Sequence, residues 1–241
     1  LAKAWEEIEE ERTRALAMTA LARTRQQAQV GVMADAFSDA AFCRAMIRAM
    51  GQGLTLKTTH GQLRFASTSA YAAVVGDRLD EFPVSKPLGQ SSNTVVTLDE
   101  TLFLKGYRVI RPGVNIEYEV GRFLTEVARF PHAVQVLGVL EHIDELGEVR
   151  TLAIAQGYVS NQGDGWAYTT SYLERYLEQV RNQGVDQPAD VHGAFLELMS
   201  TLGRRTAEMH AAFALKSGDP AFDPEPMSLQ DGETLRERVL G

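Results

Sequence analysis

One lysine in this sequence stands where a charged side chain needs a physical reason. Lys105 follows the apolar residues 102–104, in a run typical of a β-strand. An ammonium group that points into a cleft needs an anionic partner, because an unpaired buried charge is costly. Glu117 and Glu119 follow in a segment with helical spacing. Glu119 lies one turn before Phe123 and close to the apolar stripe, whereas Glu117 lies about 200° away around the helix. We therefore predict that Lys105 pairs with Glu119.

A lysine that is charged, fixed and aimed can bind phosphate oxygens. Kinase-like phosphotransferases use a strand lysine held by a helix glutamate to bind the α and β phosphates of ATP. The alternative is that Lys105 extends from an edge strand along the surface and that Glu119 faces solvent.

A polar run before the lysine is the candidate for further phosphate contacts. No Gly-x-Gly-x-x-Gly motif precedes this strand. Such contacts would therefore come from hydroxyls and backbone amides. The residues of the run are Ser91, Ser92, Asn93 and Thr94. An ordinary polar turn is the alternative interpretation of this run.

The surrounding pattern predicts the elements that position these residues. Apolar runs on both sides of Asp99 and Glu100 predict a β-hairpin. Asn115 is a suitable cap for the helix that follows, and Pro131 ends it. The Val-, Leu- and Ile-rich segments 133–143 and 149–159 predict a second hairpin. The predicted order is hairpin, helix, hairpin.

Further elements flank this central part. Before it, we predict a strand at 30–33, a helix capped by Ser38 that ends at Gly51 and Gly53, and a half-buried strand at 62–68. After it, the chain turns helical. The capping-box pair Ser171 and Glu174 predicts one helix start, Asp190 predicts another, and the tail predicts a loop and a short helix.

Composition restricts the class of protein. The 241 residues carry a net charge of −8, which argues against non-specific binding to nucleic acid or to an anionic membrane surface. The single cysteine, Cys43, excludes an internal disulfide, and no apolar run is long enough to span a bilayer. His132 and His142 show no metal-ligand spacing with Cys43 or a carboxylate cluster, so we predict no metal site. We expect a cytoplasmic protein. The first residues lack the features of a secretory signal, and because the chain has no initiating methionine, we also expect a fragment.

Several longer strings resemble one protein family. They are "QSSNTVV", "LFLKGYR", "RPGVNIEYEVGRFLTEVARFPHA", "LAIAQGYVSNQGDGW" and "LGRRTAEMH". Together they resemble the bacterial maltokinases, most closely the form fused behind trehalose synthase, and the resemblance runs along nearly the whole chain. It implies ATP-dependent phosphorylation of maltose to maltose 1-phosphate with Mg²⁺, in the metabolism of trehalose and α-glucan.

The resemblance also implies a fold and roles for residues. The fold is α+β and protein-kinase-like, related to aminoglycoside phosphotransferases. Residues 1–85 would be a cap remnant, 86–160 an N-lobe with an antiparallel sheet and one helix, and 161–241 the hinge and a truncated helical C-lobe. The implied roles are a phosphate-side loop at Ser91, Ser92, Asn93 and Thr94, a phosphate-binding lysine at Lys105 with its partner Glu119, and adenine contacts from the backbone at Gln156, Gly157, Tyr158 and Val159.

The sequence departs from the family pattern at the catalytic loop. The family's catalytic aspartate lies in a His-Gly-Asp motif, whereas this chain has His-Gly-Gln at His60 and His-Gly-Ala at His192. We therefore assign no catalytic residue and no metal ligand, and predict that the fragment alone is inactive. One alternative is a non-catalytic structural or regulatory appendage of a trehalose synthase. Another is a kinase-like phosphotransferase for a different small acceptor, such as an aminosugar or a choline-like alcohol.

Overall fold

The chain forms two compact units. The structure is a computed structural model, and it describes residues 3–4, 20–85, 93–183 and 192–240. One unit comprises residues 1–126 and 133–160, and the other comprises 127–132 and 161–241. The division after Ser160 falls within the segment "QGYVSNQGDGW".

The first unit holds all the described strands. The strands are β1 (Lys3–Ala4), β2 (Ala20–Gln26), β3 (Gln29–Ala34), β4 (Thr55–Thr58), β5 (Gly61–Ser67), β6 (Val84–Ser85), β7 (Thr94–Leu98), β8 (Leu102–Gly106), β9 (Val136–Ile143) and β10 (Val149–Gly157). The helical segments are η2 (Ala36–Ser38), α2 (Ala40–Gln52), α3 (Tyr71–Val74), α4 (Ile116–Arg122) and the π-helical turn η3 (Phe123–Val127), which continues α4. The predicted strand at 30–33 and both predicted hairpins are confirmed.

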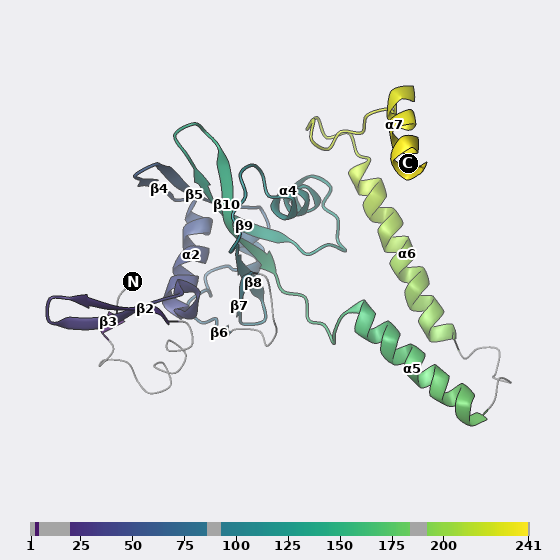
Figure 1. The fold of residues 1–241 in the computed structure, drawn as a ribbon, viewed down its shortest axis with the longest axis horizontal. Coiled ribbons are helices and arrows are strands. Elements are labelled where there is room, and N and C mark those ends of the chain that lie inside the picture. Colours follow the sequence, from purple (N-terminus) through teal and green to yellow (C-terminus); the bar gives the residue numbers. More distant parts are fainter. Residues whose placement is uncertain (1–2, 5–19, 86–92, 184–191, 241) are drawn as a thin grey trace. The chain divides into compact units, whose positions relative to one another are not determined.

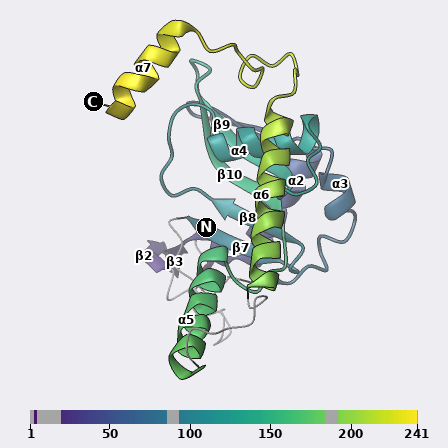
Figure 2. The ribbon, with the colours of Figure 1, turned by 90° about the vertical axis from the view of Figure 1, so that its right-hand side faces the viewer.

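One antiparallel sheet organises this unit. Its seven strands follow the order β4-β5-β9-β10-β8-β7-β6, and β1, β3 and β2 form a separate sheet. In Figure 2, β9, β10, β8 and β7 follow one another in the order of the larger sheet. Strand β5 pairs with β9, so the sheet continues across the predicted boundary at residue 85. Residues 1–85 and 86–160 thus share one sheet, and the interpretation of the first range as a cap remnant stays a prediction.

The main core lies between the sheet and α2. Strand β8 alternates between buried Leu102 and Leu104 and half-buried Phe103 and Lys105, as expected from the two-residue period of a strand. The two leucines join the buried cluster that includes Ile47 of α2. Figure 1 shows α2 and α4 on opposite sides of the sheet. Lys105 therefore points to the side of the sheet away from the α2 core.

The helix predicted before residue 53 is confirmed, with a different cap. Its first turn is capped by Asp39, whose carboxylate accepts a hydrogen bond of 2.8 Å from the amide of Ala41. The Ser38 hydroxyl instead donates to the carbonyl of Asp35, so the predicted Ser38 cap is wrong. At the other end Gly53 has a φ of 62°, the left-handed conformation that glycine adopts without steric cost.

The glycine of β9 allows α2 to pack closely on the sheet. A Cβ atom at Gly138 would lie 2.8 Å from the carbonyl oxygen of Ala66 and 3.0 Å from Met50. Since the Ala66 oxygen belongs to the neighbouring strand, it cannot move aside without distorting the sheet. We expect Gly138→Ala to lower the free energy of unfolding by about 1–3 kcal/mol, measured by urea denaturation. Gly157→Ala is the matched control, because its nearest neighbour would lie at 3.8 Å. Equal effects of the two variants would refute the packing argument.

The second unit is helical. Its helices are α5 (Gly165–Gln183), α6 (Gly193–Phe213) and α7 (Leu229–Leu240). Helix α5 begins before the predicted capping box, because the Asp164 carboxylate accepts a hydrogen bond from the amide of Ala167, and Ser171 lies inside the helix. The rings of Tyr172 and Phe195 stack with centroids 4.2 Å apart, which joins α5 to α6. The predicted cap Asp190 lies outside the described residues. Among the described helices, none combines the length and apolarity needed to cross a bilayer.

Candidate functional site

Lys105 lies on an internal strand of the sheet. Strand β8 has β7 on one side and β10 on the other, and Lys105 is paired with Val95 and Ile154. The edge-strand alternative is therefore wrong for this lysine. Its side chain is 23% exposed. The ammonium group is thus held on a half-covered surface of the sheet, where a charged partner is required.

The partner of the lysine is Glu117. The Lys105 ammonium donates to both carboxylate oxygens of Glu117, at 2.7 Å and 3.0 Å. The predicted pair of Lys105 with Glu119 is wrong. The pair nevertheless forms between the predicted strand and the predicted helix, which are β8 and α4. Glu119 is half-buried. Within the described part of the chain, Glu119 forms no ion pair.

The start of α4 explains this choice of glutamate. Asn115 caps the helix, and its side-chain oxygen accepts hydrogen bonds from the amides of Glu117 at 2.9 Å and Tyr118 at 3.2 Å. Glu117 therefore lies in the first turn, beside the end of β8. Proximity to the apolar stripe of α4 was the wrong criterion, because the lysine meets the capped first turn of the helix and not its later turns. The rotation of α4 about its axis, which sequence spacing does not reveal, selects Glu117.

Tyr107 completes the arrangement. Its hydroxyl donates to Glu117 at 2.9 Å, and its ring centroid lies 5.5 Å from the Lys105 ammonium, within range of a cation–π contact. Burial and the neighbouring Glu117 carboxylate raise the pKa of Tyr107 above its ordinary range. Glu117 thus accepts from both an ammonium and a phenol, and the three side chains form one network. Sequence reasoning missed Tyr107, which lies two residues after Lys105 and so on the same face of the chain.

The raised pKa of Tyr107 predicts a loss of stability in alkaline solution. An unfolded tyrosine ionises near pH 10, while the folded chain keeps the Tyr107 hydroxyl protonated. The contribution of Tyr107 to the free energy of unfolding is therefore fully present below about pH 10. It is lost as the pH rises towards the higher pKa of the folded state. The pKa values of Tyr71 and Tyr118 are also raised, mainly by burial, so they contribute in the same direction. We expect Tyr107→Phe to flatten the decline measured by urea unfolding between about pH 9 and pH 11. An unchanged slope would contradict this assignment.

A mostly apolar surface adjoins the lysine. Phe103 points to the same side of β8 as Lys105, and its ring lies 4.9 Å from the ring of Tyr158 between centroids. Ile154 of β10 is fully buried beside them. A flat apolar surface next to a fixed cation suits a planar ring that carries phosphates. Sequence reasoning missed Phe103, although the alternation of β8 places it on the lysine face.

The predicted adenine segment lies at the end of β10. Gln156 is paired with Phe103, and Gly157 is paired with Leu102. The amide of Gly157 donates to the carbonyl of Gln135, and the amide of Tyr158 donates to the carbonyl of Thr101, both at 2.8 Å. These two amides are thus already used within the sheet and its turn. A contact of either amide with adenine would require that its hydrogen bond be shared or exchanged.

Val159 ends this segment. This residue is 56% exposed. Val159 follows directly on Tyr158, whose ring contacts Phe103, so the end of the segment reaches the apolar surface beside the lysine. The roles of all four residues in binding adenine stay predictions.

The polar run before β7 is only partly described. Ser91 and Ser92 lie outside the described residues, and Asn93 is half-buried. Thr94 is paired with Gly106, one residue along from the pair of Val95 with Lys105, so its side chain points to the opposite face from the lysine. Its hydroxyl accepts a hydrogen bond of 3.1 Å from Arg108. The structure thus does not bring the Thr94 hydroxyl to the lysine, and only the backbone of Thr94 is left for the predicted role.

A buried ion pair lies on the lysine side of the sheet, at β5 and β9. The Glu141 side chain is 3% exposed, and Arg64 donates to one of its oxygens at 2.5 Å and 3.1 Å. The Glu141 charge, after burial, is the second cause of the raised pKa of Tyr118 in α4. Arg64 and Glu141 therefore lie close to the helix that carries Glu117. We interpret them as support for the position of α4.

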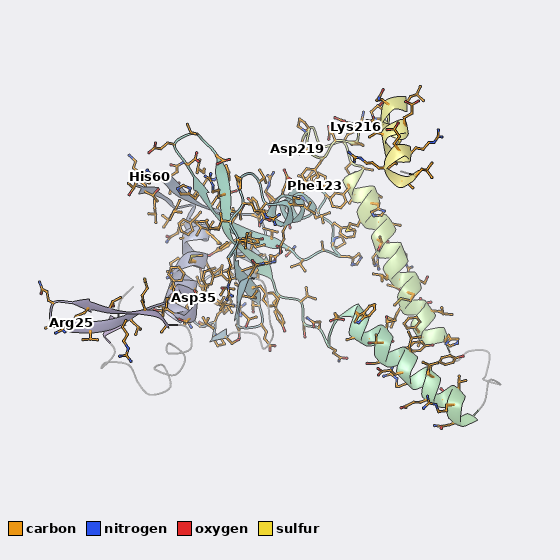
Figure 3. All side chains as sticks on the ribbon, in the orientation of Figure 1. Arg25, Asp35, His60, Phe123, Lys216 and Asp219 are labelled. Atoms are coloured by element: carbon orange, nitrogen blue, oxygen red, sulfur yellow. The ribbon has the colours of Figure 1, made fainter. Side chains whose placement is uncertain are left out.

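The described residues offer no ready metal centre. Among them, no three His, Cys, Asp or Glu side chains gather in a way that could hold a metal ion. His60, which begins the His-Gly-Gln string, lies at the tip of the β4–β5 hairpin in Figure 3, and its side chain is 85% exposed. Figure 3 also marks Phe123, where α4 passes into η3. No step that uses a metal is assigned to these residues.

Known structures resemble this fold. A scan against protein-family models finds no match for the chain. A glucosamine kinase in complex with glucosamine, ADP and inorganic phosphate matches with a TM-score of 0.55 at 18% identity, over 90% of this chain and 44% of that one. A second crystal form of glucosamine kinase matches with a TM-score of 0.50 at 16% identity, over 83% and 42%. The chain thus spans less than half of the length of these kinases. Over that length, it has the mixed α/β, kinase-like fold that they have.

Proposed function

We propose that the chain is the nucleotide-binding part of an ATP-dependent sugar kinase. The observation that carries this proposal is the Lys105–Glu117 pair, with contacts of 2.7 Å and 3.0 Å, at an internal strand of an antiparallel sheet. Phosphoryl transfer depends mainly on positioning and on charge stabilisation, so a fixed ammonium beside the triphosphate is a central requirement. The similarity in fold to a kinase whose structure contains ADP supports this proposal.

In this proposal the nucleotide lies across the lysine face of β8. The Lys105 ammonium has three hydrogens, and Glu117 accepts from it without covering it, since the lysine stays 23% exposed. The adenine ring would rest against the aromatic surface of Phe103 and Tyr158, near the end of β10. Mg²⁺ would be bound by residues outside the Lys105 network. The network contains one carboxylate, that of Glu117, and it already accepts hydrogen bonds from Lys105 and Tyr107.

The acceptor that we propose is maltose, with maltose 1-phosphate as the product. This proposal rests on the strings that resemble maltokinases, and so does the proposed link to a fused or associated trehalose synthase. An aminosugar acceptor is the second candidate, because the structures with a similar fold are of glucosamine kinase.

A binding and activity assay tests the proposal. ATP is titrated calorimetrically into the 241-residue chain, and phosphate transfer to maltose and to glucosamine is then measured for the chain and for a longer parent protein. We expect saturable ATP binding by the chain without transfer, because the chain contains no His-Gly-Asp motif. We expect transfer to maltose by the parent. Absence of ATP binding would refute the proposal, and transfer to glucosamine alone would replace maltose by the second candidate.

A further inference from the structure

The end of β10 carries a polar side chain on the lysine face of the sheet. Gln156 of β10 is paired with Phe103 of β8. Two residues earlier, Ile154 is paired with Lys105. Paired residues of an antiparallel ladder point to the same face, so the side chain of Gln156 lies on the face that carries Phe103 and Lys105. The two pairs are separated by two residues, or about 7 Å along the strand.

The side-chain amide of Gln156 lies among apolar groups. Ile154 is fully buried, and the rings of Phe103 and Tyr158 lie with their centroids 4.9 Å apart. Gln156 itself is half-buried, and its side chain makes no hydrogen bond to any residue that the structure describes. A glutamine side chain has one carbonyl acceptor and two N–H donors. All of these groups are therefore open to a ligand that lies on this surface.

Two backbone amides of the same segment are already paired. The amide of Gly157 donates to the carbonyl of Gln135, and the amide of Tyr158 donates to the carbonyl of Thr101. A base that rests on the aromatic surface would thus meet paired backbone amides and an unpaired side-chain amide. Adenine carries its 6-amino donor next to a ring-nitrogen acceptor, which matches the acceptor and donor of a glutamine side chain.

We infer that the Gln156 side chain selects adenine in the proposed nucleotide site. Its Oε1 atom accepts a hydrogen bond from the 6-amino group, and its Nε2 atom donates to the neighbouring ring nitrogen. The resemblance implies only backbone contacts from Gln156, so this role of the side chain is additional. The inference rests on the proposed function, because it assigns a base preference to that same site. A pair of hydrogen bonds of this kind changes affinity by about fivefold to a hundredfold.

The test compares two nucleotides that differ by one amino group. ATP and purine riboside 5′-triphosphate, which lacks the 6-amino group, are titrated calorimetrically into the 241-residue chain under the same conditions. We expect ATP to bind about fivefold or more tightly than the analogue. Gln156→Met keeps an unbranched side chain of similar length without the amide, so the two affinities should then agree within about twofold. The ratio of affinities is the readout, because a general disturbance of the site weakens both nucleotides alike.

A second substitution separates the acceptor from the donor. Gln156→Glu keeps an oxygen that accepts from the 6-amino group, whereas its negative charge repels the phosphates of both nucleotides. We expect both nucleotides to bind more weakly than they bind to the unchanged chain, with the preference for ATP retained. Loss of that preference would contradict the assignment of Oε1 as the acceptor.

A matched control and two outcomes complete the test. Gln52 is an exposed glutamine at the end of α2, so Gln52→Met should leave both affinities unchanged. Circular dichroism confirms that each variant is folded. Equal binding of the two nucleotides to the unchanged chain, or a preference that survives Gln156→Met, would overturn the inference and leave the proposed function standing. Absence of binding of either nucleotide would refute the proposed function and the inference with it.

Discussion

Replacing Lys105 with methionine is expected to weaken ATP binding by about tenfold to a hundredfold. Hydrogen bonds between a charged donor and a phosphate are each worth about 1.5–3 kcal/mol, and methionine keeps the apolar stem while removing the ammonium. The lysine is only 23% exposed and is held by Glu117, so the substitution removes a fixed cationic donor. The measurement is calorimetric titration of ATP into the 241-residue chain. Unchanged affinity would exclude the lysine face of β8 as the phosphate site.

The two glutamates of α4 provide the sharper comparison. Glu117→Gln keeps the size of the side chain but removes the charge that fixes Lys105 at 2.7 Å and 3.0 Å. We expect it to weaken ATP binding by about threefold to tenfold, because the ammonium is then less well oriented. Glu119→Gln changes the same residue type on the same helix and should stay within about twofold of the unchanged chain. The reverse order of these two effects would restore the original prediction that Glu119 is the partner.

Replacing Arg64 with methionine is expected to lower the free energy of unfolding by about 2–3 kcal/mol. The substitution leaves the Glu141 carboxylate, 3% exposed, without its cation. Loss of one partner of a buried ion pair costs about 3–5 kcal/mol, and we reduce this figure because the Arg64 side chain is 48% exposed. Urea denaturation followed by circular dichroism measures the change.

An exposed ion pair of the same length gives the control. Arg48 and Asp80 also meet at 2.5 Å, but their side chains are 43% and 78% exposed. Arg48→Met should therefore cost at most about 1 kcal/mol, because water solvates the remaining carboxylate. If both arginine variants lost the same stability, burial of Glu141 would not be the cause, and the proposed support of α4 by this pair would fail. Glu141→Gln offers an independent check, since a neutral amide removes the need for the cation.

Much of the first unit follows from local sequence patterns. The hairpin of β7 and β8 turns at Asp99 and Glu100, where the predicted turn residues take φ values of 51° and 45°. The alternation of β8 and the cap of α4 at Asn115 are local features too. They depend on neighbours within a few residues, so periodicity and side-chain chemistry reveal them. The α2 cap was wrong by a single residue, because Asp39 and Ser38 are both good caps and only the backbone conformation separates them.

The site depended on contacts between distant parts of the chain. Sequence spacing indicated that a strand lysine and a helix glutamate belong together, and both elements formed where they were expected. Which glutamate faces the lysine depends on how α4 is rotated about its axis. The loop before α4 sets that rotation. In this loop Gly113 has a φ of 88°, and its amide donates a hydrogen bond to the carbonyl of Val149 in β10.

Short-range sequence patterns therefore determine the identity and order of the central elements. They also place a lysine on the half-covered face of β8. The pairing with Glu117 and the participation of Tyr107 arise only when β8 and α4 pack together. The physical reason is that helix and strand periods fix side-chain directions within one element. They leave the rotation and offset between elements to the packing of the whole unit.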